Sequence, residues 1–215
     1  ALLKDAQSLQ KPLLRFYAWK RPSVTFGHFI DPYMHLNKDA LEKHSVDIAK
    51  RPTGGGILFH HYDFSFSILY PHDYPNLSNH VIDNYALVNN KVLKALQVLD
   101  ASYKESISLW PTCDPEVQSF CMAKPTQFDL IYNGKKIGGA AQRRTKMGLL
   151  HQSSIFLFTP LWQLIEEIVH IEEKGALLRM KKLSQSILQQ DFELSIYEKV
   201  QSLLKNELSH QFAQL

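Results

Sequence analysis

The segment from Phe128 to Arg144 constrains the fold more than any other part of the chain. It reads as two strands joined at Asn133-Gly134, the dipeptide most typical of a tight β-hairpin turn. The return strand carries Lys135 and Lys136 and then the small residues Gly138 to Ala141, which would let a ligand approach the backbone closely. Because successive strand residues face opposite ways, only one of the two lysines can point at that ligand. Taken alone, the segment is also compatible with an exposed hairpin whose lysines are solvated.

A run of three glycines, Gly54, Gly55 and Gly56, is the second informative feature, and Arg51 stands just before it. Backbone N–H groups in such a run can wrap around a carbonyl, carboxylate or phosphate group, and the guanidinium can balance its charge. The run lies between two strand patterns rather than in a polar loop, which favours a ligand-binding turn over a flexible surface turn. It lacks the Gly-Lys-Ser/Thr ending of a nucleotide-binding P-loop.

Composition limits the class of protein. A chain of 215 residues with 45% hydrophobic and 21% charged residues is typical of one globular domain with a real core. No apolar run reaches the length of a bilayer span, and no signal-peptide pattern opens the sequence. Two cysteines suggest free thiols in a reducing compartment, and a net charge of +3 is too small for a nucleic-acid-binding surface. The ten histidines show no metal-ligand spacing except the pair His60-His61, whose side chains would face opposite ways on a strand. We therefore expect no metal site, no nucleic acid and no membrane.

The remaining patterns predict one α+β domain with a mixed, mostly antiparallel β-sheet and helices packed on it. The period-two alternation of Phe64 to Tyr70 predicts a half-buried strand. We expect further strands over residues 13–19, 24–29, 47–50, 57–61, 107–110 and 148–158. We expect helices over residues 38–44, from a Ser78 or Asn79 cap to about 99, after Thr159-Pro160, over 176–189 and over 194–212.

Taken together, these motifs resemble those of the biotin/lipoate protein ligase and octanoyltransferase superfamily, in the same order, from about residue 13 to residue 158. Lys50 to His60 is similar to the family's Arg-Arg-x-Gly-Gly-Gly-x-x-x-His loop. Gly134 to Gln142 is similar to its Gly-Arg-Lys-x-x-Gly-Ser-Ala-Gln segment, whose essential lysine corresponds to Lys136. The resemblance implies the catalytic fold shared by class II aminoacyl-tRNA synthetases and biotin synthetases. We expect residues 1–215 to form that single domain, with no accessory C-terminal domain.

Cys121 to Asp129 resembles the Cys-Phe-x-x-Pro-Ser-x-Tyr-Glu pattern of cysteine-dependent octanoyltransferases, in which the cysteine carries the acyl group as a thioester. ATP-dependent lipoate ligases usually have an Arg-Asn-Asp stretch there, and an Asn a few residues after the His of the glycine loop, where this chain has Asp63. Without the resemblance, Cys121 would be read as an unreactive loop residue. Cys113 matches no motif and is interpreted as structural, and a reducing compartment argues against a disulfide between the two cysteines.

The expected chemistry needs a thiolate, because a neutral thiol is a poor nucleophile and a free one has a pKa of about 8.5. Lys136 is the candidate cation that favours the thiolate of Cys121 and donates a hydrogen bond to the developing oxyanion. The resemblance implies that the other site residues bind substrate. These are Arg51, Gly54, Gly55, Gly56, His60, Gly139, Ala140, Ala141 and His151.

Three departures from the family pattern leave the substrate open. Ala140 replaces the usual Ser, Lys50 replaces the first Arg, and His151 to Ser154 differs from the usual Gln-His-Gly-Ser or His-His-Gly-Thr.

The leading function is transfer of an octanoyl (or lipoyl) group, through a Cys121 thioester, to a lysine on a lipoyl carrier domain. The donor would be an acyl carrier protein, and the acceptor the glycine-cleavage H protein or a 2-oxoacid dehydrogenase E2, in the cytoplasm and without a cofactor. The first alternative is a lipoate-protein ligase that uses ATP and Mg²⁺ and forms lipoyl-AMP. The second alternative is a non-catalytic protein that binds lipoyl domains or a free acyl acid.

Overall fold

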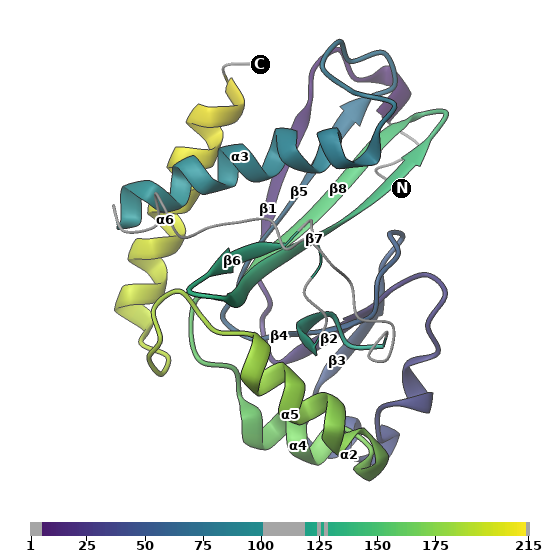
Figure 1. The fold of residues 1–215 in the computed structure, drawn as a ribbon, viewed down its shortest axis with the longest axis vertical. Helices are drawn as coiled ribbons and strands as arrows, with labels where there is room; N and C mark the ends of the chain where they lie inside the picture. The colour runs from purple at the N-terminus through teal and green to yellow at the C-terminus, as the bar shows by residue number, and fades with distance from the viewer. Residues whose placement is uncertain (1–5, 101–118, 124–125, 127–128, 214–215) are drawn as a thin grey trace.

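The computed structural model describes residues 6–100, 119–123, 126 and 129–213, and its strands form two sheets (Figure 1). The larger sheet has five antiparallel strands in the order β1-β5-β8-β7-β6, and the smaller has the order β3-β2-β4. In the smaller sheet β2 is parallel to β3 and antiparallel to β4. The strands are β1 Leu13–Tyr17, β2 Ser23–Phe26, β3 Asp47–Lys50, β4 Ile57–His60, β5 Phe64–Pro71, β6 Leu130–Tyr132, β7 Lys135–Thr145 and β8 Gly148–Ile155.

The predicted α+β fold with mostly antiparallel strands is confirmed, although the strands are divided between two sheets. The helices are α2 Lys38–Lys43, α3 Val81–Leu99, α4 Trp162–Ile168, α5 Lys174–Leu183 and α6 Leu194–Ala213. Short 3-10 turns are η1 Ala6–Ser8, η2 Pro32–Met34, η5 Cys121–Ala123 and η6 Ile171–Glu173. None of the helices in the described ranges is both long and apolar enough to cross a membrane.

The hairpin that dominates the sequence forms as predicted. Asn133 and Gly134 have φ values of 48° and 72°, and the left-handed conformation at both positions is that of a type I′ turn. Tyr132 pairs with Lys135 across the turn, and a register shift between Leu130 and Ile131 interrupts the pairing of β6 with β7.

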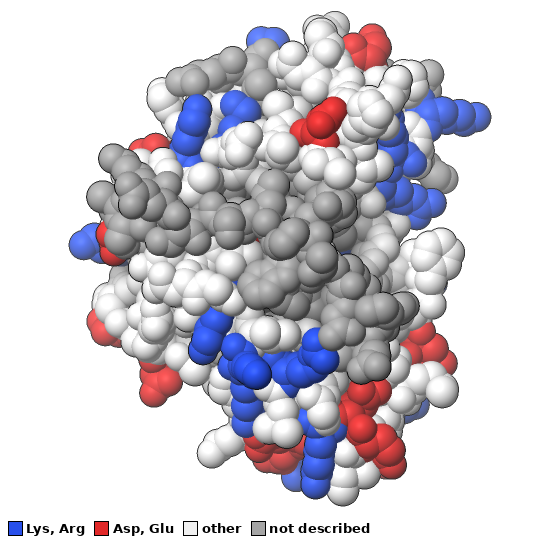
Figure 2. Space-filling model, viewed as in Figure 1, with Lys and Arg blue, Asp and Glu red and all other residues white. Residues whose placement is uncertain are grey.

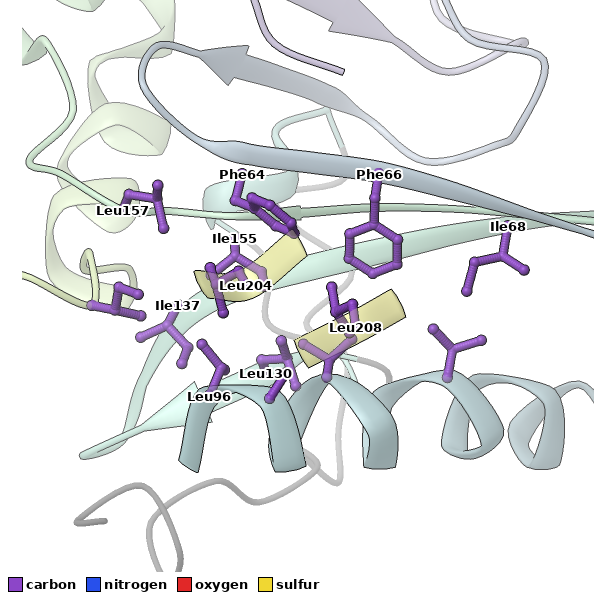
Figure 3. Packing of buried hydrophobic residues seen from close by; sticks show 14 of the residues in the cluster. Phe64, Phe66, Ile68, Leu96, Leu130, Ile137, Ile155, Leu157, Leu204 and Leu208 are labelled. Atoms are coloured by element: carbon purple, nitrogen blue, oxygen red, sulfur yellow. The ribbon is translucent and has the colours of Figure 1, made fainter. Parts of the chain in front are cut away.

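A layer of helices covers one face of the larger sheet. Helices α3 and α6 pack on it, and Figure 3 shows Phe64, Phe66 and Ile68 of β5 among the side chains of this core. Contrary to the half-buried prediction, every residue of β5 is buried. Its other face carries Ser65 and Ser67, which are also buried and line a cavity.

A second core lies below the smaller sheet, where α2, α4 and α5 gather (Figure 1). Leu41 of α2, Ile165 of α4 and Met180 of α5 pack there with Val24 and Ile57 of the sheet. This core holds η5, the turn that begins at Cys121, because Met122 and Ala123 are buried in it.

Several element boundaries differ from prediction. Helix α3 begins after His80 and α4 after Leu161, each later than the predicted cap. Helix α5 ends at Leu183 because the next residues leave the helix: Gln185 N–H donates to the carbonyl of Lys136 and Ile187 N–H to that of Phe156. The predicted strand over residues 107–110 lies outside the described residues, as does Cys113. That residues 1–215 form one catalytic domain stays a prediction.

Gly27 allows the glycine run to approach β2. A Cβ placed on Gly27 would lie 1.9 Å from the carbonyl oxygen of Gly55. We expect Gly27→Ala to lower the free energy of unfolding by about 1–3 kcal/mol, because the two backbone segments would have to separate. Gly54→Ala is the matched control, since its Cβ would meet nothing within 4 Å. Urea denaturation of both variants measures the difference, and equal losses would contradict the close approach.

Candidate active site

A cavity of about 500 Å³ lies where the two sheets meet, and its size is within the usual range of small-molecule sites. The smaller sheet contributes Thr25, Leu58 and His60 to its wall. The larger sheet contributes the serines of β5 and the small residues of β7. Seven of the predicted site residues line this one cavity. They are Cys121, Lys136, Arg51, His60, Gly139, Ala140 and Ala141.

Cys121 is half-buried and is the first residue of η5. The preceding residues bind β4, since Phe120 forms a bridge with Ile57 and the N–H of Ile57 donates to the carbonyl of Ser119 at 2.6 Å. The thiol sulfur lies 3.7 Å from the position that a Cβ on Gly55 would occupy. The glycine run therefore lies next to the thiol, although none of its three glycines is among the described residues that line the cavity.

Lys136 is the lysine of the pair that faces the cavity, and only 4% of it is exposed, whereas Lys135 is half-buried outside it. Its ammonium lies 2.8 Å from Oδ2 of Asp129 and donates to the carbonyl oxygen of Cys121, also at 2.8 Å. The cation that we expected at the thiol is thus engaged with a carboxylate and with the backbone of the cysteine.

Asp129 is a site residue that the sequence reasoning missed. Its carboxylate accepts hydrogen bonds from the N–H of Thr126 at 2.6 Å and from its hydroxyl at 3.2 Å. Burial raises the pKa of Asp129, while the Lys136 ammonium and the Thr126 donors oppose that rise. The signal was present, because Asp129 stands where the acyltransferase pattern ends in Glu.

The ion pair also explains the glycine at position 139. A Cβ there would lie 2.7 Å from Oδ1 of Asp129 and 3.1 Å from Nζ of Lys136. A glycine is therefore needed at position 139 to make room for the ion pair, and not only for a ligand. Ala140 and Ala141, next along β7, are the small residues left for a ligand to contact.

Arg51 holds the glycine run through its carbonyl groups. Its Nη2 donates to the carbonyl of Gly56 at 2.7 Å and to that of Gly54 at 3.4 Å, and its Nη1 donates to Oγ1 of Thr25 at 2.7 Å. We expected the run to bind a ligand through its N–H groups, with Arg51 beside it. The guanidinium instead fixes the shape of the turn and contributes to the cavity wall.

His60 is buried and lies between two polar partners. Its Nδ1 is 2.9 Å from Oδ2 of Asp63, and its Nε2 is 2.7 Å from Oγ1 of Thr25. Burial alone would raise the pKa of Asp63, but His60 and the hydroxyls of Ser154 and Ser65 hold it below its usual range.

His151 does not line the cavity. It is fully buried, its ring packs against Phe66 and Tyr85, and its Nδ1 lies 2.8 Å from Nε2 of Gln142. Burial lowers the pKa of His151 to about 3. The substrate contact predicted for His151 does not fit this placement, because its side chain faces the helical layer while its neighbour Gln152 lines the cavity.

Among the residues that the structure describes, no group of three or more His, Cys, Asp or Glu side chains could hold a metal ion.

A family model described as the lipoyl protein ligase A/B catalytic domain matches residues 1–204. The chain belongs to this family. A relative named octanoyltransferase LipM from Carboxydothermus hydrogenoformans is 30% identical over 158 residues, which cover 73% of this chain and 58% of the relative. Another, from Halalkalibacterium halodurans, is 26% identical over 159 residues, or 71% of this chain and 56% of the relative. The chain thus spans a little more than half the length of these curated relatives.

The fold has a close counterpart in a crystal structure of lipoate-protein ligase A bound with ATP. The TM-score is 0.71 at 20% identity, and the match covers 97% of this chain and 78% of the other. At this identity the likeness establishes the fold, which is that of a lipoate-protein ligase catalytic domain.

The pair of Lys136 and Asp129 can be tested by a double-mutant cycle. We expect Asp129→Asn to lower the free energy of unfolding by about 3–5 kcal/mol, because it leaves a buried ammonium without its counter-charge. In a Lys136→Met background the same change should cost much less, and Lys135→Met, the matched control, should change stability by about 0.5 kcal/mol or less. Urea denaturation gives the free energy of unfolding of wild type, the two single variants and the double variant. If the losses of the two single variants add up to the loss of the double variant, the pairing is wrong.

His151 makes stability depend on pH. Its pKa is about 3 in the folded chain and about 6.5 when unfolded, so below pH 6.5 the unfolded state binds a proton that the folded state does not. Stability is therefore lost as pH falls from 6.5 toward 3. Between pH 7 and pH 5 we expect His151 to account for about 2 kcal/mol of this loss. Denaturation of wild type and His151→Gln at both pH values measures it; equal losses in the two proteins would contradict the assignment.

Proposed function

We propose that this chain is an acyltransferase of lipoate metabolism that moves an octanoyl (or lipoyl) group through a thioester on Cys121 to a lysine of a lipoyl carrier domain. The observation that carries the proposal is the half-buried thiol of Cys121 at the wall of a cavity that also contains Lys136. The names of the curated relatives support the same reaction.

In the first step the thiolate of Cys121 attacks the carbonyl carbon of an acyl thioester on the carrier. A new carbon–sulfur bond forms, the carrier's carbon–sulfur bond breaks, and the carrier leaves as a thiolate that takes up a proton. Lys136, already next to the backbone of Cys121, is the candidate donor to the oxyanion.

In the second step the neutral ε-amine of the acceptor lysine attacks the thioester on Cys121. An amide bond forms, the thiol leaves, and the proton lost by the amine returns to the sulfur. Both steps proceed from a thioester, so the reaction needs no ATP and no metal. The acyl chain would lie along the apolar part of the cavity, against Ala140, Ala141 and Phe156.

A lipoate-protein ligase is the second candidate, and it would need ATP and Mg²⁺. The likeness to a ligase bound with ATP supports it, as do Lys50 and Arg51, whose positive charges at the cavity could attract phosphate. In that reaction Cys121 has no part. A non-catalytic acyl-binding protein is the third candidate, supported by the departures at Ala140 and Gln152, both of which line the cavity.

Basic side chains beside the site support carrier domains as partners, with an acyl carrier protein as donor and an H protein or E2 lipoyl domain as acceptor. Helix α5, which packs on η5, carries four basic and no acidic residues. Figure 2 shows lysine and arginine side chains gathered on the lower part of this face, where Figure 1 places α5, with acidic side chains beside them; one of the latter, Glu166, pairs with Lys181. Such a surface suits an acidic partner. We place the reaction in the cytoplasm, where Cys121 would remain a free thiol.

Intact-mass analysis tests the proposal. We expect the protein to gain one octanoyl group when mixed with octanoyl carrier protein without ATP, and hydroxylamine to remove it, because a thioester is labile. Cys121→Ser should gain no hydroxylamine-labile group. Cys113→Ser, which changes the other cysteine, is the matched control and should gain it as wild type does.

Failure of wild type to acquire the group would contradict the thioester mechanism. Adding ATP, Mg²⁺, lipoate and a lipoyl domain then separates the alternatives. Modification of the lipoyl domain only with ATP identifies a ligase, and binding without modification identifies a non-catalytic protein.

A further inference from the structure

Four buried or half-buried side chains form a continuous hydrogen-bonded line from the larger sheet to the glycine run. We propose that Asp63, His60 and Thr25 are positioning residues that hold the Arg51 guanidinium and, through it, the glycine run against the thiol of Cys121. This inference deepens the proposed function and rests on it for the reaction that the line would support.

With one ring proton on His60, the two ends of the line set a consistent direction for each hydrogen bond. A guanidinium can only donate, and an ionised carboxylate can only accept. Arg51 therefore donates to Thr25, so the Thr25 hydroxyl hydrogen is left for Nε2 of His60, and Nδ1–H of His60 is left for Asp63. With one ring proton on His60, every donor in the line has one acceptor.

The His60 end of the line is anchored to the larger sheet. Oδ2 of Asp63 also accepts from the hydroxyls of Ser65 in β5, at 2.7 Å, and of Ser154 in β8. The indole of Trp19 stacks on the His60 ring at 4.1 Å between centroids and donates to Oγ of Ser65 at 3.1 Å. Rotation of the ring would break its two buried hydrogen bonds and its stacking on Trp19.

The Arg51 end of the line lies on the same side of Gly55 as the sulfur of Cys121. A Cβ on Gly55 would lie 3.3 Å from Nη2 of Arg51 and 3.7 Å from the sulfur of Cys121, so the guanidinium and the thiol lie beside the same point next to Gly55. Arg51 also fixes the carbonyls on either side of Gly55. Loss of the Thr25 bond would leave the guanidinium held only by these carbonyls, and the turn beside the thiol would lose its link to β2 through Arg51.

Thr25 is the link to test, because it bridges the two halves of the line and Val has nearly its shape without the hydroxyl. We expect Thr25→Val to lower kcat of octanoyl transfer by about 10- to 100-fold with KM changed by less than about threefold, the effect of displaced positioning groups. Thr25→Ser, which keeps the hydroxyl, should restore most of the rate.

A second measurement does not depend on the proposed reaction. In a Cys113→Ser background only Cys121 can react with iodoacetamide, and we expect Thr25→Val, but not Thr25→Ser, to change its alkylation rate by at least about threefold. Thermal denaturation of each variant shows whether it is folded; if Thr25→Val is not, Thr25→Ala tests the same bond.

The outcomes separate the two proposals. A changed alkylation rate in a protein that transfers no octanoyl group supports the positioning line and rejects the transferase. Octanoyl transfer and alkylation both equal to wild type in folded Thr25→Val overturn the positioning line and leave the transferase standing. Equal losses in Thr25→Val and Thr25→Ser also overturn it, because the serine hydroxyl can make the same bonds.

Discussion

The buried ammonium of Lys136 is the constraint on which the site depends. A charge this deep costs several kcal/mol unless it is paired, so β7 can carry Lys136 inward only if a counter-charge arrives with it. Asp129 supplies the charge and the carbonyl of Cys121 a further acceptor. The carbonyl of Lys136 itself accepts from Gln185 just after α5. Lys136 thus contacts the cysteine turn, Asp129 just before β6, and Gln185 just after α5.

The core and the site are built by alternate residues of the same strands. On β5 the aromatic residues Phe64 and Phe66 pack against the helical layer, while Ser65 and Ser67 line the cavity. On β8 His151 belongs to the helical side and Gln152 to the cavity. A shift of one residue in register would exchange the two faces, so the apolar packing that stabilises the sheet also specifies which polar groups reach the cavity.

Local signals in the sequence predicted local structure well. The Asn133-Gly134 turn, the pairing of its strands and the inward direction of one lysine follow from turn chemistry and strand alternation. What the sequence could not give depends on distant partners. The division into two sheets, the full burial of β5 and the ion pair of Asp129 are set by what packs on each element. The motif resemblance placed His151 near the site in sequence, but its side chain takes the opposite face of β8.

The charge balance of the cavity bears on which ligand it suits. Two of the cations that line the cavity already have partners: Lys136 has the carboxylate of Asp129, and Arg51 has two carbonyls and a hydroxyl. A triphosphate bound at these two cations would bring several negative charges toward the carboxylate of Asp129. A thioester is neutral and needs only hydrogen-bond donors to its carbonyl oxygen, which becomes an oxyanion in the reaction. In the proposed acyl transfer Lys136 and Arg51 keep these partners, whereas Arg15 and Lys50, which also line the cavity, are the cations that a phosphate of the ligase alternative would meet.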